Sequence, residues 1–376
     1  MTTSSAPQPA SAVRWRAGRV TAVGRGWTGA QELRVAVLEP VGDGEVEVRA
    51  LAYPALVGSP QVGDRVLLNT TTLTRGLGTG GYALVVAVPD RLPPDPPARP
   101  GHLVKARYTP LQPMLLGVDE QESEHHAVMA DADDLAGTPV VVADLHSALP
   151  AVLAGLRADA GQVAAAYVMT DGGALPAWFS RTVAALRDAG WLAGCVSVGQ
   201  AFGGDLEAVT VHTGMLAARE VLGAEVVVVA RGPGNLGSGT RWGFSGVSAG
   251  EAVNAAAVLG GRPVASLRVS QADARERHRG VSHHSLTAYG RVALAPADVV
   301  VPLLEGELGE RVRSQAASLA PPTGRHRLVE VATDGLLEAL ASAPVRLSTM
   351  GRGLDEDAAA FLAAAAAGRQ AASLLG

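Results

Sequence analysis

The stretch "TPVVVADLHSALPAVLAGLRAD", residues 138–159, decides the fold that we expect for most of the chain. Its first half is an unbroken run of β-branched residues, which is typical of a strand buried on both faces of a sheet. Its second half has the alanine and leucine spacing of a helix. A buried strand that leads directly into a helix indicates a parallel sheet covered by helices.

The same alternation continues through residues 102–376. Further strand-like runs are 163–170, 191–199, 224–231, 262–270, 297–304 and 344–350. Helix-like segments follow several of these runs, including 175–190 and the alanine-rich end at 355–375. We therefore predict an α/β fold in which a mainly parallel, doubly wound, Rossmann-like sheet occupies residues 102–376.

The N-terminal part of the chain has a different pattern. Residues 13–91 contain short, partly alternating strand-like runs separated by turn residues, which predicts a small β-barrel. The segment "LPPDPPARPG", residues 92–101, is too rich in proline to continue a strand or helix, so we expect a linker. We expect residues 1–12 to be disordered.

The composition indicates a well-packed globular protein. Hydrophobic residues make up 48% of the 376 residues and charged residues 18%. The net charge of −5 gives no basic excess that would favour a polyanionic partner. We find no apolar run of ~20 residues and no signal-peptide pattern, so we expect a cytoplasmic protein without a membrane partner. The single cysteine, Cys195, lies in an apolar run and is expected to be buried.

Polar and small residues gather directly after the predicted strands. After the first two strands these residues are Asp144, His146, Thr170, Asp171, Gly172 and Gly173. In an open parallel sheet, ligands bind beyond the carboxyl ends of the strands. We therefore predict a ligand cleft at this edge.

The segment 232–246 follows the fourth strand and is rich in glycine. Backbone N–H groups in such a loop can surround a phosphate or carboxylate group. The residues expected to bind are Gly232, Gly234, Asn235, Gly237, Ser238, Gly239 and Thr240. The main hypothesis is therefore a protein that binds a small anionic or phosphate-bearing ligand, and whether it also transforms that ligand as an enzyme is left open by the sequence. The loop lacks the Gly-Lys-Ser/Thr of a P-loop, and the sequence identifies no cofactor.

Two adjacent histidines, His283 and His284, follow the fifth strand in "SHHS". Their neighbours Ser282 and Ser285 are expected to contact the ligand. Side chains of adjacent residues point in different directions, so we expect one imidazole of the pair to reach the ligand. That imidazole would act as a proton-exchanging catalytic group.

Three further groups are candidates for the chemistry. Asp144 or Asp171 would orient the reactive imidazole. Alternatively, His146, His283 and Asp144 would hold a metal ion in a metal-dependent hydrolase. Lys105 is the single lysine among 31 basic residues, and we expect its ammonium group to reach the ligand.

A third interpretation assigns the function to the barrel. Its strand-like segments carry arginine and tryptophan side chains of the kind on which single-stranded nucleic acid stacks: Arg14, Trp15, Arg16, Arg19, Arg25 and Trp27. The chain would then be a non-enzymatic nucleic-acid-binding or protein-binding module. Tryptophan burial and ordinary surface charge explain the same residues equally well. The alanine-rich C-terminus also fits a homodimer.

Several segments together resemble a known family. They include "LVGSPQVGDRVLLNTT", "MTDGGALPAWFSRTV", "GPGNLGSGTRWGFSG" and "RERHRGVSHHSLTA". With these segments the chain resembles a bacterial domain-of-unknown-function family, DUF3866, found in actinobacteria and some Gram-positive anaerobes. The resemblance covers nearly the whole chain and implies a cytoplasmic bacterial protein. It implies no activity, so the site predictions depend on the residues above.

Overall fold

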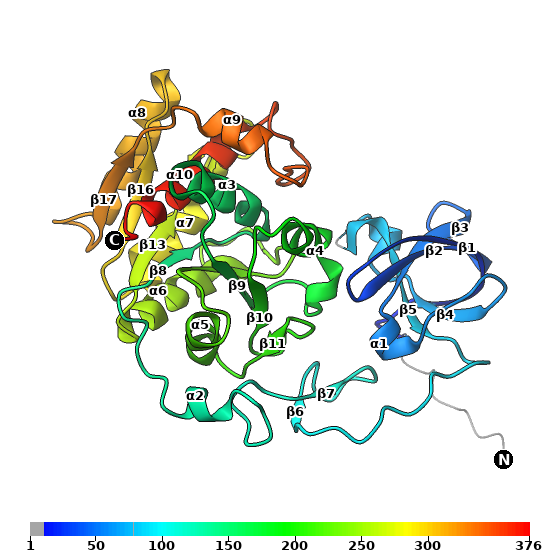
Figure 1. The fold of residues 1–376 in the computed structure, drawn as a ribbon. Helices are drawn as coiled ribbons and strands as arrows, with labels where there is room; N and C mark the ends of the chain where they lie inside the picture. The colour runs from blue at the N-terminus through cyan, green and yellow to red at the C-terminus, as the bar shows by residue number, and fades with distance from the viewer. Residues whose placement is uncertain (1–10, 78) are drawn as a thin grey trace, which may run out of the picture. The chain divides into compact units, whose positions relative to one another are not determined.

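The computed structural model describes residues 11–77 and 79–376 and divides the chain into two compact units (Figure 1). These units are Met1–Arg99 and Pro100–Gly376. Residues 92–101 contain no helix or strand, as their proline content predicts. Residues 1–10 of the segment expected to be disordered lie outside the described residues.

The first unit is built around a closed barrel of five strands. The strands are β1 (Trp15–Trp27), β2 (Ala30–Val41), β3 (Glu45–Ala52), β4 (Arg65–Asn69) and β5 (Ala83–Ala87). Their order is β1-β2-β3-β5-β4, and a short helix, α1 (Pro54–Val57), follows β3. Gly18 lets β1 approach β2, because a Cβ at this position would lie 2.5 Å from the Val35 side chain. The predicted small barrel is confirmed.

The second unit contains an eight-stranded sheet in which all the paired strands are parallel. In spatial order the strands are β11 (Leu206–Glu207), β10 (Gly194–Ser197), β9 (Ala165–Thr170), β12 (Val226–Arg231), β8 (Pro139–Val142), β13 (Arg262–Ser266), β16 (Asp298–Pro302) and β17 (Arg327–Val331). Two small hairpins accompany the sheet: β6 (Leu103–Val104) with β7 (Met114–Leu115), and β14 (Val269–Ser270) with β15 (Gly280–Val281).

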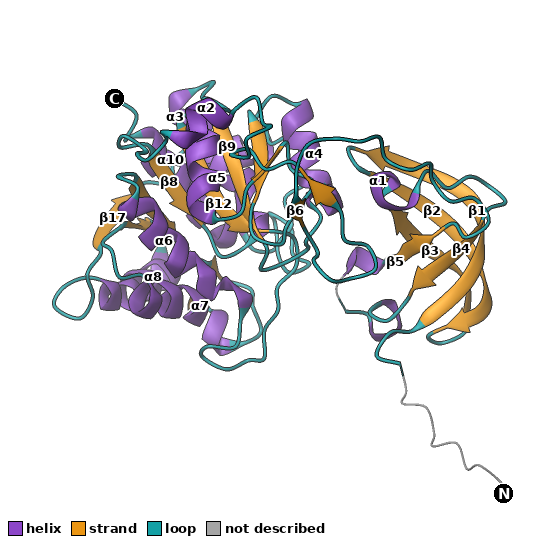
Figure 2. Cartoon of the chain, turned by 90° about the horizontal axis from the view of Figure 1, so that it is seen from below, coloured by secondary structure: helices purple, strands orange, loops and turns teal. Residues whose placement is uncertain are grey.

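Helices cover both faces of this sheet (Figure 2). One face packs against α3 (Leu149–Ala160), α4 (Arg181–Asp188), α9 (Leu336–Ala341) and α10 (Ala358–Ala372). The other face packs against α2 (His126–Ala130), α5 (Val211–Glu220), α6 (Ser248–Val258) and α8 (Gly306–Ala316), together with the π-helical turn η7 (Ala288–Val292). The predicted doubly wound α/β fold is therefore confirmed.

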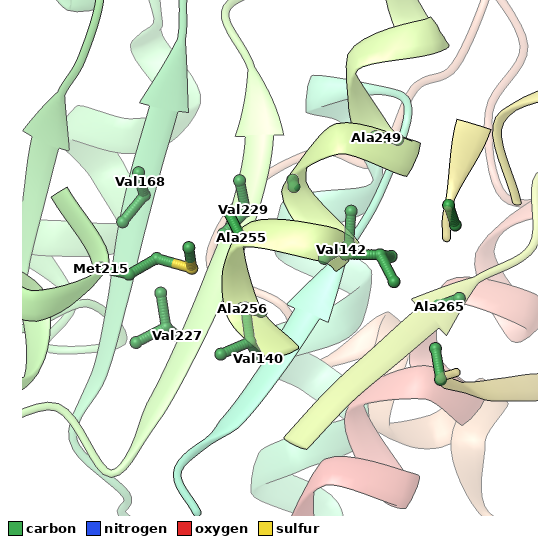
Figure 3. Close-up of a cluster of buried hydrophobic side chains, with 14 of the residues drawn as sticks. Val140, Val142, Val168, Met215, Val227, Val229, Ala249, Ala255, Ala256 and Ala265 are labelled. Carbon is green, nitrogen blue, oxygen red and sulfur yellow. The ribbon is translucent and has the colours of Figure 1, made fainter. Parts of the chain in front are cut away.

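The two-residue period of a strand explains why the β8 run is hydrophobic throughout. Val140 and Val142 point into the α5 and α6 side, whereas Val141 points into the α3 and α10 side. Figure 3 shows Val140 beside Ala256 of α6, whereas Met215 of α5 lies further along the same face beside Val168. All three β8 valines are fully buried, as the continuous β-branched run predicts.

Small residues let α3 and α10 pack closely on the face opposite α6. A Cβ at Gly155 would lie 1.9 Å from the carbonyl oxygen of Ala365, and one at Gly368 would lie 1.9 Å from that of Val152. Neither position has room for alanine without displacement of the helix backbones. The alanine-rich C-terminus therefore forms a core helix, in agreement with the prediction for 355–375.

Two details of the predicted elements are wrong. Residues 344–350 form no strand; the last strand is β17, whose residues are mostly half-exposed and therefore give a weak pattern at the sheet edge. The helix expected over 175–190 begins only at Arg181, because the Ser180 side chain accepts a hydrogen bond from Val183 N and caps the helix there. Among the described residues, no helix is long and apolar enough to cross a membrane.

Candidate functional site

Asp144 lies at the point where the sheet changes its direction of winding. It follows β8, which lies between β12 and β13. The chain leaves β8 into α3 on one face and leaves β12 into α6 on the other, and this change opens a crevice at the strand ends. A small cavity lies on each side of Asp144: Arg231 helps to line one and Arg268 helps to line the other.

Two buried arginines surround the Asp144 carboxylate. Arg231 ends β12 and is 2% exposed, and Arg268 follows β13 with Nη1 3.9 Å from Asp144 Oδ2. Burial raises the pKa of Asp144, but His284, Arg268 and Arg231 outweigh that effect and hold its pKa below the usual value. Asp144 is therefore a buried carboxylate. Its Oδ2 atom, with Nε and Nη2 of Arg231, has no hydrogen-bond partner among the described residues.

Three histidines lie together beside this charged group. One ring nitrogen from each of His278, His283 and His284 lies within 4.8 Å of the others. Ser282 organises them, because its Oγ accepts a hydrogen bond from His284 N at 3.2 Å and pairs with His278 Nδ1 at 2.7 Å. This serine caps the short helix α7 (His283–Thr287), which carries the other two rings.

The adjacent histidines have different surroundings. His284 is 6% exposed and stacks on Phe244, with ring centroids 3.7 Å apart and planes within 2°. His284 Nδ1 lies 3.2 Å from Arg268 Nη1 and 3.7 Å from Asp144 Oδ2. His283 instead lines an open groove, and its buried Nε2 has no hydrogen-bond partner within the described residues. The two ring centroids lie only 4.4 Å apart, contrary to the expectation that adjacent side chains point apart, but His283 is the one that a ligand in the groove would meet.

Two of the three histidines, His278 and His283, are neutral at physiological pH. Burial lowers the pKa of His278 to about 3, and Arg268 and Arg275 add to this effect. Burial likewise lowers the pKa of His283 to about 4, with contributions from His284 and Arg277. Neutral imidazoles keep a lone pair that can accept a proton or bind a metal ion.

The groove beside His283 is basic. It has a volume of about 690 Å³ and is lined by three exposed arginines, Arg241, Arg277 and Arg291. No acidic residue contributes to the lining formed by the described residues, and none of these arginines makes an ion pair within them. Leu286 adds an apolar wall. The groove therefore combines positive charge with apolar surface.

The loop 232–246, which is expected to cradle an anion, folds largely onto itself in the described structure. Ser238 N donates to Gly243 O at 2.7 Å, and Thr240 Oγ1 accepts from Gly243 N at 3.2 Å. Asn235 Oδ1 accepts from Ser245 Oγ at 3.2 Å. Of the loop residues predicted to bind, Gly239 alone lines the groove in the described structure. The loop's polar side chains are used mainly for its own turns.

Gly173, in the loop after β9, and Gly232, in the loop after β12, serve packing. A Cβ at Gly173 would lie 2.1 Å from Gly232 O, and one at Gly232 would lie 2.3 Å from Ala174 O. These glycines let two strand-exit loops touch by their backbones. Gly172 lies against Arg231 and has room for a Cβ, with its nearest contacts at 3.5 Å.

Other predicted residues support the site from within. Thr170 lines the small cavity between Asp144 and Arg231. Ser282 and Ser285 are fully buried. Ser285 Oγ accepts from Arg268 N at 2.9 Å, so this serine positions the arginine. Neither serine lines the groove in the described structure.

His146 does not join the other predicted metal ligands. Its Nε2 pairs with Ser180 Oγ at 2.8 Å and its Nδ1 with Tyr167 OH at 3.1 Å. Within the described ranges, the cluster of side chains suited to a metal ion comprises His278, His283 and His284. The fold therefore does not bring together His146, His283 and Asp144. The turn that carries His146, η3 (His146–Ala148), packs on the α3 face instead.

Asp171 and Lys105 hold other loops. Asp171 Oδ2 accepts from Gln200 N at 2.9 Å. Lys105 Nζ donates to Ala201 O at 3.0 Å and Ala208 O at 2.8 Å, and it lies 3.6 Å from Glu207. Lys105 is 2% exposed, so its ammonium group fastens the β10–β11 edge instead of reaching the groove.

The barrel residues behind the nucleic-acid interpretation are partly committed to the barrel itself. Arg16 Nε donates to Pro40 O at 3.2 Å, and Arg16 Nη1 lies 3.7 Å from Glu39. Arg19 Nη1 donates to Gly63 O at 2.5 Å. Trp15 is 43% exposed. The buried thiol of Cys195 agrees with the expectation, and burial raises its pKa.

The comparison with protein families matches a model described as "Protein of unknown function (DUF3866)" over residues 49–368. The chain belongs to the DUF3866 family. The match confirms the resemblance found in the sequence and includes every strand exit described above. A comparison with curated proteins found no match.

Sequence reasoning missed several groups that shape the site of this DUF3866 member. Arg231 and Arg268 stand at strand exits, so the rule that selected Asp144 could have found them. His278 lies five positions before His283 and was harder to identify as a site residue. The sequence spacing does not bring the two rings together; they lie close only because β14 and β15 pair. The groove arginines come from separate segments, which no local pattern connects.

Proposed function

We propose that this protein binds a small anionic ligand, bearing a phosphate or carboxylate group, in the groove beside His283. The observation that carries the proposal is the convergence of Arg241, Arg277 and Arg291 on one groove whose described lining contains no acid. Guanidinium groups donate paired hydrogen bonds that match the oxygens of phosphate and carboxylate.

The groove has the size and the mixed lining of a small-molecule site. Its volume of about 690 Å³ falls within the usual range of roughly 300–1,000 Å³ for such sites. Leu286 and Leu319 would contact an organic part of the ligand, while the arginines bind its charged end. The ligand is therefore expected to be a phosphate ester or an organic acid.

His283 supplies the proton-exchanging group in this proposal. Its ring is neutral without a ligand, and an anion beside it favours the protonated form. In the metal-free protein, binding would therefore raise the pKa of His283 from about 4 toward neutrality. Asp144 and Ser282 would position the neighbouring rings instead of touching the ligand.

Isothermal titration with inorganic phosphate, followed by phosphate esters and organic acids at low salt, tests the proposal. We expect Arg241→Gln and Arg291→Gln each to weaken binding at least about tenfold, since charge-assisted hydrogen bonds contribute roughly 1.5–3 kcal/mol. Arg346→Gln, at an exposed arginine outside the groove, is the matched control. Absence of binding at millimolar anion, or equal binding by all these variants, contradicts the proposal.

A further inference from the structure

We propose that His278, His283 and His284 form a binding site for one divalent transition-metal ion of the Zn²⁺ type. The three rings offer nitrogen atoms that lie within 4.8 Å of one another. Zn–N bonds of about 2.0–2.1 Å place tetrahedral ligands roughly 3.4 Å apart, so the rings need to close by only about 1–2 Å. Side-chain rotation can supply such a movement.

The hydrogen bonds leave suitable ring nitrogens free in the described structure. His278 uses Nδ1 for Ser282, and His284 uses Nδ1 for Arg268, so Nε2 of each ring is available. His283 Nε2 is buried and has no hydrogen-bond partner in the described part of the chain. A buried polar nitrogen without a partner costs free energy, and a metal–nitrogen bond would remove that cost.

Outer partners of the kind that metal-binding histidines require are already in place. Ser282 Oγ can accept the Nδ1 proton of His278 at 2.7 Å. Asp144 Oδ2 lies 3.7 Å from His284 Nδ1 and has no hydrogen-bond partner among the described residues. When a metal occupies Nε2 of His284, the ring proton moves to Nδ1, which then gives up the hydrogen bond from Arg268 and donates to this carboxylate once the two groups close from 3.7 Å to hydrogen-bond distance.

The ligand atoms of the cluster, together with the charges around it, indicate which type of ion it binds. Arg268 and Arg231 oppose a cation, whereas the Asp144 carboxylate partly cancels them. The cluster offers imidazole nitrogen and no carboxylate oxygen as a direct ligand. Mg²⁺ and Ca²⁺ prefer oxygen ligands, whereas Zn²⁺ and its transition-metal neighbours gain strongly from imidazole. The site is therefore a transition-metal site.

His283 connects this cluster with the groove, because it belongs to the cluster and also lines the groove wall. An ion bound through three histidines keeps an open coordination position for water or a ligand oxygen. An anion in the groove could occupy that position, and this coupling rests on the proposed function. Metal binding itself depends on the histidines alone.

Tag-free, full-length protein treated with a chelator and then titrated with Zn²⁺ alone tests the site. We expect about one bound equivalent by elemental analysis, a rise in melting temperature, and visible absorption of tetrahedral Co²⁺ when Co²⁺ replaces Zn²⁺. His278→Gln and His283→Gln should each lower the affinity at least about tenfold. His212→Gln, at an exposed histidine on α5, should leave it unchanged.

Two outcomes overturn the metal site: no stoichiometric binding by the wild type, or binding that His278→Gln and His283→Gln leave unchanged. Circular dichroism of each metal-free variant identifies loss of folding, and Asp144→Asn supplies a second measurement. That variant retains all three ligands and should weaken Zn²⁺ about 10–100-fold. Arg291→Gln separates the two proposals, because it should impair phosphate binding and retain Zn²⁺ binding.

Discussion

Nδ1 of His284 lies 3.7 Å from Oδ2 of Asp144, although the two residues are 140 positions apart in the sequence. Arg268 Nη1 reaches both, at 3.2 Å from the imidazole and 3.9 Å from the carboxylate. Because all three side chains are buried, the carboxylate is the only close counter-charge that the described structure gives to this arginine. These contacts link the end of β8, the end of β13 and the short helix α7.

Asp144→Ala should therefore lower the free energy of unfolding by about 3–5 kcal/mol, the usual effect of leaving a buried charge unpaired. Urea unfolding at pH 7 measures the change. Asp159→Ala is the matched control, because Asp159 is 41% exposed and pairs with Arg369 at the surface. That control should cost less than about 1 kcal/mol. Similar losses for both variants would contradict the inferred role of burial.

His146 should make stability depend on pH. Its folded pKa of about 4 lies below the unfolded value of 6.5, chiefly because of burial. The neutral ring therefore contributes stability above pH 6.5 that is lost as the pH falls toward 4. Integrated over that interval, the loss is roughly 3 kcal/mol. Urea unfolding of His146→Gln should show a shallower pH dependence than the wild type over this range; an unchanged slope would refute the assignment.

Lys105→Met should destabilise the protein more at pH 8 than at pH 6. Burial raises the pKa of Glu207 to about 7, even though Lys105 opposes the rise. A raised carboxyl pKa gives stability that is present at low pH and lost as the pH rises through the folded pKa. Without Lys105 the pKa of Glu207 rises further, so the variant keeps losing stability between pH 7 and pH 8, by up to about 1.4 kcal/mol more than the wild type.

The double variant Lys105→Met/Glu207→Gln checks the origin of that loss. Removal of the buried carboxylate should recover much of the stability at pH 8 and flatten the pH dependence. The free energies of unfolding of both single variants and the double variant give the coupling energy directly. Strict additivity would show that the two side chains act independently.

Gly155→Ala should destabilise the protein by roughly 1–3 kcal/mol or more, because the added methyl group overlaps the α10 backbone. A Cβ atom at this position would lie 1.9 Å from Ala365 O, which is far closer than van der Waals contact. Gly353→Ala is the control, since its nearest neighbours would lie at 3.7 Å and 3.9 Å. Melting temperatures of the two variants measure the difference, and equal values would exclude close helix packing as the cause.

The residue pattern alone was sufficient to predict the barrel, the doubly wound sheet and its alanine-rich closing helix. Runs such as 140–143 are hydrophobic at every position because both faces are buried, and this pattern is local in the sequence. The strand-exit rule also selected Asp144, His283 and His284, since all parallel strands present their carboxyl ends at one edge. No local pattern distinguished the imidazole of His283, which lines the groove, from the buried imidazole of His284.

Tertiary structure alone decided which polar groups line the groove and which hold the scaffold. The hydroxyl and amide groups of the loop 232–246 form hydrogen bonds within its own turns, and the ammonium group of Lys105 donates to two backbone carbonyls. The basic groove needs arginines from three segments to converge on His283. Hydrogen-bonding capacity is visible in a sequence, but its allocation depends on which groups lie within about 3 Å after folding. Because the loop's polar side chains are used within the fold, the candidate site lies at the histidine cluster and its groove and not at the glycine-rich loop.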